Sequence, residues 1–557
     1  MPVPTTPGDR FAADVNRYIE EFGKTHPESA TSLGITTFDS LASDVSAAGW
    51  TGQTQRDKYW LATFDRYKPG QLNDTQQIDQ QLLLTQLRSS IATADYAPWK
   101  RDPTLYMSDG TFELFMHGNR SEAEATDAAI ARLANVPNNV AAGIANLNEN
   151  LASKVLITER GIPSIRAQAE FVRDELPTFV KDPALRARLA EAGAKAAESY
   201  DRFAKYLDGF GQRAHGDFAF GEKRYNAVLQ QGEGLNYDAR SLRELGRAQF
   251  KEINAEMEDL AQQIWGSRDW RAHVSELQEK RPTSMDDLVA RYRAETERAR
   301  QFVIDHNLMT VPPDERAAVE PAPGFLRSSI SVASYFPPPA FGPKAQGTFN
   351  VPVTPDGATP EQQEQRLKSN ADYMIPSVTA HETYPGHHLH WVEAEGSDAL
   401  RQMLNSTYFI EGWALYVEKM MDEQGFYRDP AERLGYLNMR LFRAARIIVD
   451  TSLHLNEMSF DEAVKFMGEK VGFPEDTARG EVRRYASWPT QASAYLTGAL
   501  EIDRLSKQWQ AEGKGTLREF NDAITSAGKL PLGVAAAAIG LAPRLVAPPV
   551  TAHALGS

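Results

Sequence analysis

Residues 381–388 read His-Glu-Thr-Tyr-Pro-Gly-His-His and carry most of a dense histidine cluster. Four of the eleven histidines in the 557-residue chain fall within ten positions: His381, His387, His388 and His390. The chain contains no cysteine, so a bound transition metal would need histidine and carboxylate ligands. The cluster therefore indicates a metal site built from imidazoles and acidic side chains.

The spacing of these histidines departs from the familiar HExxH helix, in which two histidines four residues apart face one ion. Here the second histidine follows His381 by six or seven residues, a rise of about 9 to 10.5 Å on a straight helix. Pro385 cannot donate to the carbonyl of His381, and Gly386 can adopt backbone angles closed to other residues, so the helix can widen or break there. We expect His381 and either His387 or His388 to bind the ion, with His387 favoured. The alternative is a histidine-rich helix end, where cations suit the negative end of the helix dipole.

A third ligand is predicted in residues 405–418, which read as a mostly buried helix because of their apolar content. A carboxylate in such a helix must be paired or bind a metal to offset its desolvation, so Glu411 is the natural third ligand. Taken alone, Glu411 would more often be a structural ion-pair residue. Glu418, two turns later on the same face, is a candidate hydrogen-bond partner for a ligand.

The pattern of apolar residues predicts a mainly α fold with one small sheet. Residues 1–310 and 361–557 repeat apolar side chains at helical spacing, whereas the proline-rich segment 311–360 forbids a long helix. Within that segment, Ser328–Phe336 and Gly347–Val351 alternate with the period of strands. We expect these three regions to form one continuous fold unit.

Composition narrows the classes of partner and the compartment. The net charge of −15 disfavours binding to nucleic acid or to anionic lipid, both of which are recognised through clustered lysine and arginine. The N-terminal segment lacks the basic start and apolar run of a secretory signal, and no stretch of about 18 apolar residues occurs. A cytoplasmic protein is therefore expected, although a signal removed upstream would leave the same sequence. Nothing in the sequence predicts an oligomeric state.

Three motifs together resemble one protein family. The segments HETYPGHH at 381–388, EGWALYVE at 411–418 and WPTQASAYLTG at 488–498, with a start at 27–34, resemble the bacterial domain-of-unknown-function family 885. This family is similar to helical zinc metallocarboxypeptidases with an HExxH motif and, more distantly, to neurolysin-like oligopeptidases. The resemblance implies a zincin-like, elongated helical metallopeptidase fold with the small sheet beside a central cleft.

The resemblance also implies roles for individual residues. His381, one of His387 and His388, and Glu411 become zinc ligands, and Glu382 becomes the general base that takes a proton from a zinc-bound water. The expected function is zinc-dependent hydrolysis of a peptide or small amide, in the manner of a carboxypeptidase. Two alternatives remain: two histidines and a carboxylate can hold non-haem iron, and a site saturated by protein ligands would be a structural clamp in a non-catalytic protein.

Further residues are candidates for supporting roles. Tyr495 is a candidate oxyanion donor, with core packing as the equally weighted alternative. Arg443 and Arg484 are candidates for binding a substrate carboxylate, although a structural ion pair is the commoner role of such arginines. His454 is a candidate second proton donor, and the strand Gly347–Val351 is expected to pair with an extended peptide as an edge strand.

Overall fold

Helices dominate the computed structural model, which describes residues 6–541 apart from 109, 117, 325, 326, 328, 329, 331 and 343–345. A short three-stranded sheet accompanies them, so the expectation of a mainly α fold with one small sheet is confirmed. The described residues form two compact units, one of 6–227, 339–342 and 483–487, the other of 228–338, 346–482 and 488–541. The candidate metal ligands all belong to the second unit.

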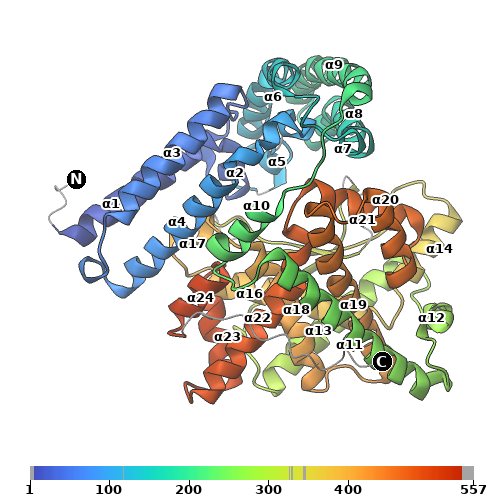
Figure 1. Ribbon diagram of the computed structural model, residues 1–557. Coiled ribbons are helices and arrows are strands. Elements are labelled where there is room, and N and C mark those ends of the chain that lie inside the picture. The colour runs from blue at the N-terminus through green and yellow to red at the C-terminus, as the bar shows by residue number, and fades with distance from the viewer. Residues whose placement is uncertain are drawn as a thin grey trace. The chain divides into compact units, whose positions relative to one another are not determined.

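The first unit is built around two long helices, α6 and α9, which lie side by side (Figure 1). Helix α9 begins where the Asp182 side chain accepts from the backbone N–H groups of Ala184 and Leu185, with Pro183 at its first position. Its buried stripe, including Tyr200, packs into the core of this unit. The helices of the first unit are α1 (Pro7–Thr25), α2 (Pro27–Ser32), α3 (Ala47–Asp65), α4 (Asp74–Thr93), α5 (Glu113–Met116), α6 (Glu122–Asn146), α7 (Lys154–Leu156), α8 (Ile162–Glu170), α9 (Pro183–Arg213) and α10 (Glu222–Ala227).

The second unit packs its long helices against one another around the candidate site. Its helices are α11 (Ala239–Trp265), α12 (Trp270–Glu279), α13 (Met285–Asp305), α14 (Pro360–Ser369), α15 (Ile375–Glu382), α16 (His387–Ala394), α17 (Ala399–Met403), α18 (Thr407–Glu423), α19 (Pro430–His454), α20 (Phe460–Phe466), α21 (Glu475–Ser487, whose last turn groups with the first unit), α22 (Gln491–Ala511), α23 (Leu517–Ser526) and α24 (Leu532–Ala538). Helix α19 contacts α11, α15 and α22, and α22 also packs along α18.

Helix α11 explains why the boundary between the units falls at residue 227 and not near 310. Its apolar residues Leu242, Ile253, Met257 and Leu260 recur at helical spacing and are buried. This stripe packs against α19, so the chain after residue 227 shares its core with the C-terminal helices.

The sheet supports the helix that carries His381. Its strands are β1 (Ala318–Pro321), β2 (Ser334–Phe336) and β3 (Thr348–Val351), with β3 in the centre, parallel to β1 and antiparallel to β2. Phe349 of β3 shares a buried apolar cluster with Tyr292 of α13 and with Ile375 and Val378 of α15. The sheet and α13 thereby hold α15 from its apolar side.

Candidate metal centre

The histidine segment is broken into two helices at the predicted position. Helix α15 ends at Glu382 and α16 begins at His387, with a cis peptide between Tyr384 and Pro385. A Cβ atom on Gly386 would lie 1.9 Å from the carbonyl oxygen of His381, so this close approach of the backbone requires glycine. Because His381 and His387 lie on two different helices, the distance expected for them along one straight helix does not apply.

Three side chains from three helices meet beside this break and form what we call the three-ligand cluster: His381, His387 and Glu411. One nitrogen or oxygen from each lies within 4.8 Å of the others. Glu411 Oε2 is 3.6 Å from Nε2 of His381 and 3.5 Å from Nε2 of His387. Two imidazoles and one carboxylate are the donor set of catalytic zinc sites that keep a position open for water.

His388, the other histidine predicted as a possible ligand, turns toward a different set of partners. Its Nε2 pairs with Glu315, and its Nδ1 lies 3.1 Å from the hydroxyl of Tyr335. The Tyr384 hydroxyl also donates to Glu315, at 2.9 Å. The structure thus brings His387, and not His388, to His381 and Glu411.

Two buried groups behind His381 orient its ring. Its Nδ1 lies 2.7 Å from Oε1 of Glu418, as the sequence suggested for this glutamate, and Ser377 donates to the other oxygen of Glu418 at 2.6 Å. Such a carboxylate fixes the tautomer and ring orientation of a ligating histidine and leaves Nε2 for the ion. Although burial opposes protonation, Glu411 and Glu418 raise the pKa of His381 to about 9.

The carboxylate of Glu411 is held in its ionised form by the same contacts. Burial acts to raise its pKa, but the interactions with His381 and His387 outweigh burial and hold the pKa well below its usual value. An ionised carboxylate between two imidazoles is ready to accept a cation.

Glu382 lies at the end of α15, beside the three-ligand cluster, with its side chain partly exposed. The backbone N–H of Tyr335, on the edge strand β2, donates to Oε2 of Glu382 at 2.9 Å. Burial raises the pKa of Glu382, and the charge of Glu411 adds to this shift, against the opposing effect of His381 and His387. A carboxyl group with a raised pKa is suited to take and return a proton near neutral pH.

The candidates for supporting roles fall in different places. Tyr495, on α22, is partly exposed, and its ring lies 5.7 Å from the guanidinium of Arg443 and 4.6 Å from that of Arg446. His454 is fully buried near the end of α19, with Nε2 3.6 Å from Oδ1 of Asp450. Arg484 belongs to the first unit, where its guanidinium lies 5.3 Å from the ring of Tyr485.

The predicted pairing of Gly347–Val351 with a peptide is wrong. Strand β3 begins at Thr348 and is paired on both sides, by β1 and by β2, so its backbone has no free edge for a third strand. The edge of the sheet on the side of Glu382 is strand β2. This strand covers only the end of the predicted strand Ser328–Phe336. Residues 328, 329 and 331 lie outside the described part of the chain.

Sequence reasoning missed three residues that support the site. Glu315 lies in the proline-rich segment, Tyr335 acts through its backbone N–H and its hydroxyl, and Ser377 precedes His381 by one helical turn. Only Ser377 carried a local signal, because its position places it on the same helix face as His381.

Comparison with known proteins identifies the family. Residues 27–539 match the family described as "Bacterial protein of unknown function (DUF885)". The chain belongs to DUF885. The resemblance inferred from the three motifs is therefore confirmed at the level of the family. No curated protein matches the sequence.

Two solved structures share the DUF885 fold over almost the whole chain. One is described as "a putative lipoprotein of unknown function from Shewanella oneidensis", with 22% identity, a TM-score of 0.80, and 94% of this chain and 98% of that chain covered. The other is "the putative lipoprotein from Colwellia psychrerythraea", with 20% identity, a TM-score of 0.79, and 96% and 98% covered. Neither description names a peptidase, so the likeness establishes the fold alone.

These neighbours correct the expected compartment. The expected cytoplasmic location rests on the absence of a signal-like segment, whereas both similar structures are described as putative lipoproteins. A cytoplasmic location therefore does not stand for this DUF885 protein. Among the described residues, no helix is long and apolar enough to cross a membrane.

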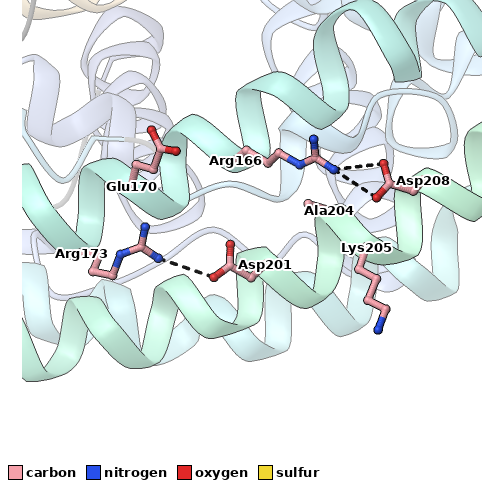
Figure 2. Close-up of a pocket in the computed structure, with 7 residues that line it drawn as sticks. All are labelled: Arg166, Glu170, Arg173, Asp201, Ala204, Lys205 and Asp208. Carbon is pink, nitrogen blue, oxygen red and sulfur yellow. Dashed lines mark hydrogen bonds and ion pairs between the residues drawn. The ribbon is translucent and has the colours of Figure 1, made fainter.

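A pocket in the first unit of the DUF885 chain is lined mainly by charged side chains (Figure 2). Ion pairs join Arg166 to Asp208 at 3.1 Å and Arg173 to Asp201 at 3.6 Å, between side chains that are largely exposed. Exposed pairs of this kind contribute little free energy. This pocket is therefore best described as a charged, solvent-exposed surface.

Proposed function

We propose that this protein is a zinc-dependent hydrolase with a zincin-like helical fold, and that it cleaves peptide or small amide bonds. The observation that carries the proposal is the meeting of His381, His387 and Glu411 directly beside Glu382. The three ligands account for a metal, and the adjacent carboxylate accounts for a hydrolytic use of that metal.

The residues present fit a zinc ion by the chemistry of their donors. The Nδ1 of His381 is engaged by Glu418, which leaves Nε2 to bind, and Nε2 of His387 faces the same oxygen of Glu411. Zinc bound by these three groups would lower the pKa of a bound water toward about 7 and polarise the scissile carbonyl.

Glu382 moves the proton in this proposal. It takes a proton from the attacking water while the new C–O bond forms, and it delivers that proton to the nitrogen of the leaving amine as the C–N bond breaks. The hydrogen bond from the Tyr335 N–H holds Oε2, so Oε1 is the oxygen that exchanges the proton. Burial raises the pKa of Glu382, which strengthens its carboxylate as a base.

Tyr495 is assigned to the negative charge that develops on the carbonyl oxygen. A hydroxyl donor held in place stabilises such an oxyanion more than it stabilises the neutral carbonyl of the substrate. The guanidinium groups of Arg443 and Arg446 lie against the Tyr495 ring.

The test compares cleavage and metal content in two variants. Glu382→Gln should keep zinc at the wild-type level and lose cleavage of a mixed peptide library by about 100-fold or more, because a general base contributes about 10²- to 10⁴-fold. Glu393→Gln, on α16 but outside the three-ligand cluster, is the matched control and should cleave at the wild-type rate. Absence of any amide cleavage by the zinc-loaded wild type, or full activity in Glu382→Gln, would contradict the proposal.

A further inference from the structure

Two arginines of α19 flank Tyr495, and within the described residues only one of them has a carboxylate partner. Arg443 and Arg446 are both buried, at 7% and 6% exposure. Arg446 pairs with Glu481 at 3.0 Å. In the described part of the chain, no carboxylate lies within ion-pairing distance of Arg443.

In the described part of the chain, the hydrogen bonds of Arg443 reach no anion. Its Nη1 lies 3.3 Å from the carbonyl oxygen of Met439 and 3.4 Å from the sulfur of the same residue, and its Nε is buried without a partner among the described residues. Arginine does not lose its proton in proteins, so this side chain remains a cation in a buried place. A buried cation without a counter-ion is costly, and a bound anion would offset that cost.

The position of Arg443 connects it with the metal centre. Helix α19 packs against α15, which carries His381 and Glu382, and against α22, which carries Tyr495. Burial and the charge of Arg446 lower the pKa of Arg443, whereas Glu418 and Glu411 are near enough to raise it. The unpaired cation therefore lies within electrostatic reach of a ligand of the three-ligand cluster.

We propose that Arg443 binds a carboxylate of the substrate, and that this carboxylate is the free C-terminus of a peptide. The inference rests on the proposed hydrolase function and narrows it to the removal of residues from C-termini. A planar guanidinium matches a carboxylate through two parallel hydrogen bonds. In a peptide the α-carboxylate follows the scissile amide, so it belongs to the leaving amine, and its capture places the last peptide bond at the metal.

The first arm of the test uses the zinc-loaded wild-type protein and three versions of one peptide. The first peptide ends in a free carboxylate, and the second ends in a C-terminal amide. The third also ends in an amide, but its last or next-to-last residue has an acidic side chain. The free acid should be cleaved with a kcat/KM about 10- to 100-fold above that of the plain amide, the range expected for hydrogen bonds to a charged group. If the third peptide is cleaved with the same kcat/KM as the free acid, an acidic side chain can replace the C-terminus. That result would overturn the proposal that Arg443 binds the C-terminal carboxylate.

The second arm uses Arg443→Met and, as a matched control, Arg446→Met. Arg443→Met should raise KM for the free acid until the acid and the amide are cleaved alike, with zinc content unchanged. Its Tm should stay level or rise, because a buried cation without a partner is replaced by an apolar chain of similar length. Arg446→Met should lower the Tm by removing the ion pair with Glu481, while the preference for the free acid persists.

Failure of this inference is distinguishable from failure of the proposed function. If no peptide is cleaved at all, the hydrolase proposal fails. If acid and amide are cleaved equally by the wild type, or if Arg443→Met lowers the Tm and both activities together, then hydrolysis stands and carboxylate binding by Arg443 is refuted.

Discussion

Gly412 of α18 and Gly498 of α22 cross so closely that a Cβ atom on Gly412 would lie 2.6 Å from the backbone of Gly498. Glu411 immediately precedes the first glycine, and Tyr495 precedes the second by one helical turn. The crossing therefore fixes the distance between the helix that supplies a metal ligand and the helix that supplies the candidate oxyanion donor. It also gives a physical reason for glycine in the two motifs EGWA and AYLTG.

Gly498→Ala tests this crossing. The new Cβ would lie 1.9 Å from the carbonyl oxygen of Tyr408, so α18 and α22 must move apart, and we expect a loss of about 1 to 3 kcal/mol in the free energy of unfolding. Gly480→Ala is the control, since nothing lies within 4 Å of its Cβ position and its helical backbone suits alanine. Urea denaturation of both variants measures the difference. Equal stability of the two variants would show that the crossing tolerates a side chain.

Glu418→Gln tests the orientation of His381. Glutamine can keep a hydrogen bond to the ring but removes the charge that makes Nε2 a better ligand, so zinc affinity should fall about 10- to 100-fold. Competition with a chromogenic chelator gives the dissociation constant. Glu423→Gln, at the exposed end of the same helix, should bind zinc as the wild type does. An unchanged affinity in Glu418→Gln would remove Glu418 from the site.

The buried carboxyl group of Glu233 should make the stability of the protein depend on pH. Burial raises its pKa to about 7, despite hydrogen bonds from Ser406 and from the backbone of Leu532. Between about pH 4.5 and pH 7 the folded state binds more protons than the unfolded state, so the free energy of unfolding falls as pH rises. The full effect is roughly 3 kcal/mol at about 1.36 kcal/mol per pKa unit.

Glu233→Gln should remove this contribution, because an amide does not titrate. Denaturant unfolding at pH 5 and pH 8 should show a smaller loss of stability in the variant than in the wild type across this interval. Parallel pH profiles for the two proteins would mean that Glu233 is ionised in the folded state.

Local sequence patterns predicted much of the second unit. The apolar stripe of α11 and the apolar helix around Glu411 follow from periodicity and burial. The break at Pro385 and Gly386 follows from the backbone properties of these two residues. These features depend on neighbours within a few residues, which a single sequence contains.

The remaining features depend on contacts between distant segments. Glu315 decides between His387 and His388, because it pairs with His388. It lies more than 70 residues before His388 in the sequence. The central position of β3 is not predictable, because its partner β1 lies in a proline-rich stretch with no strand pattern. The place of Arg443 beside Tyr495 depends on how α19 and α22 pack, which periodicity alone does not define.

The zinc content of three proteins tests the central claim most directly. Wild type, His387→Ala and His388→Ala would be dialysed against a buffer with limiting zinc, and the bound metal would be measured per chain by mass spectrometry. We expect one zinc in the wild type, one in His388→Ala, whose histidine pairs with Glu315, and less than one in His387→Ala. A wild type that binds no zinc, or a His387→Ala protein that keeps it fully, would contradict the three-ligand site.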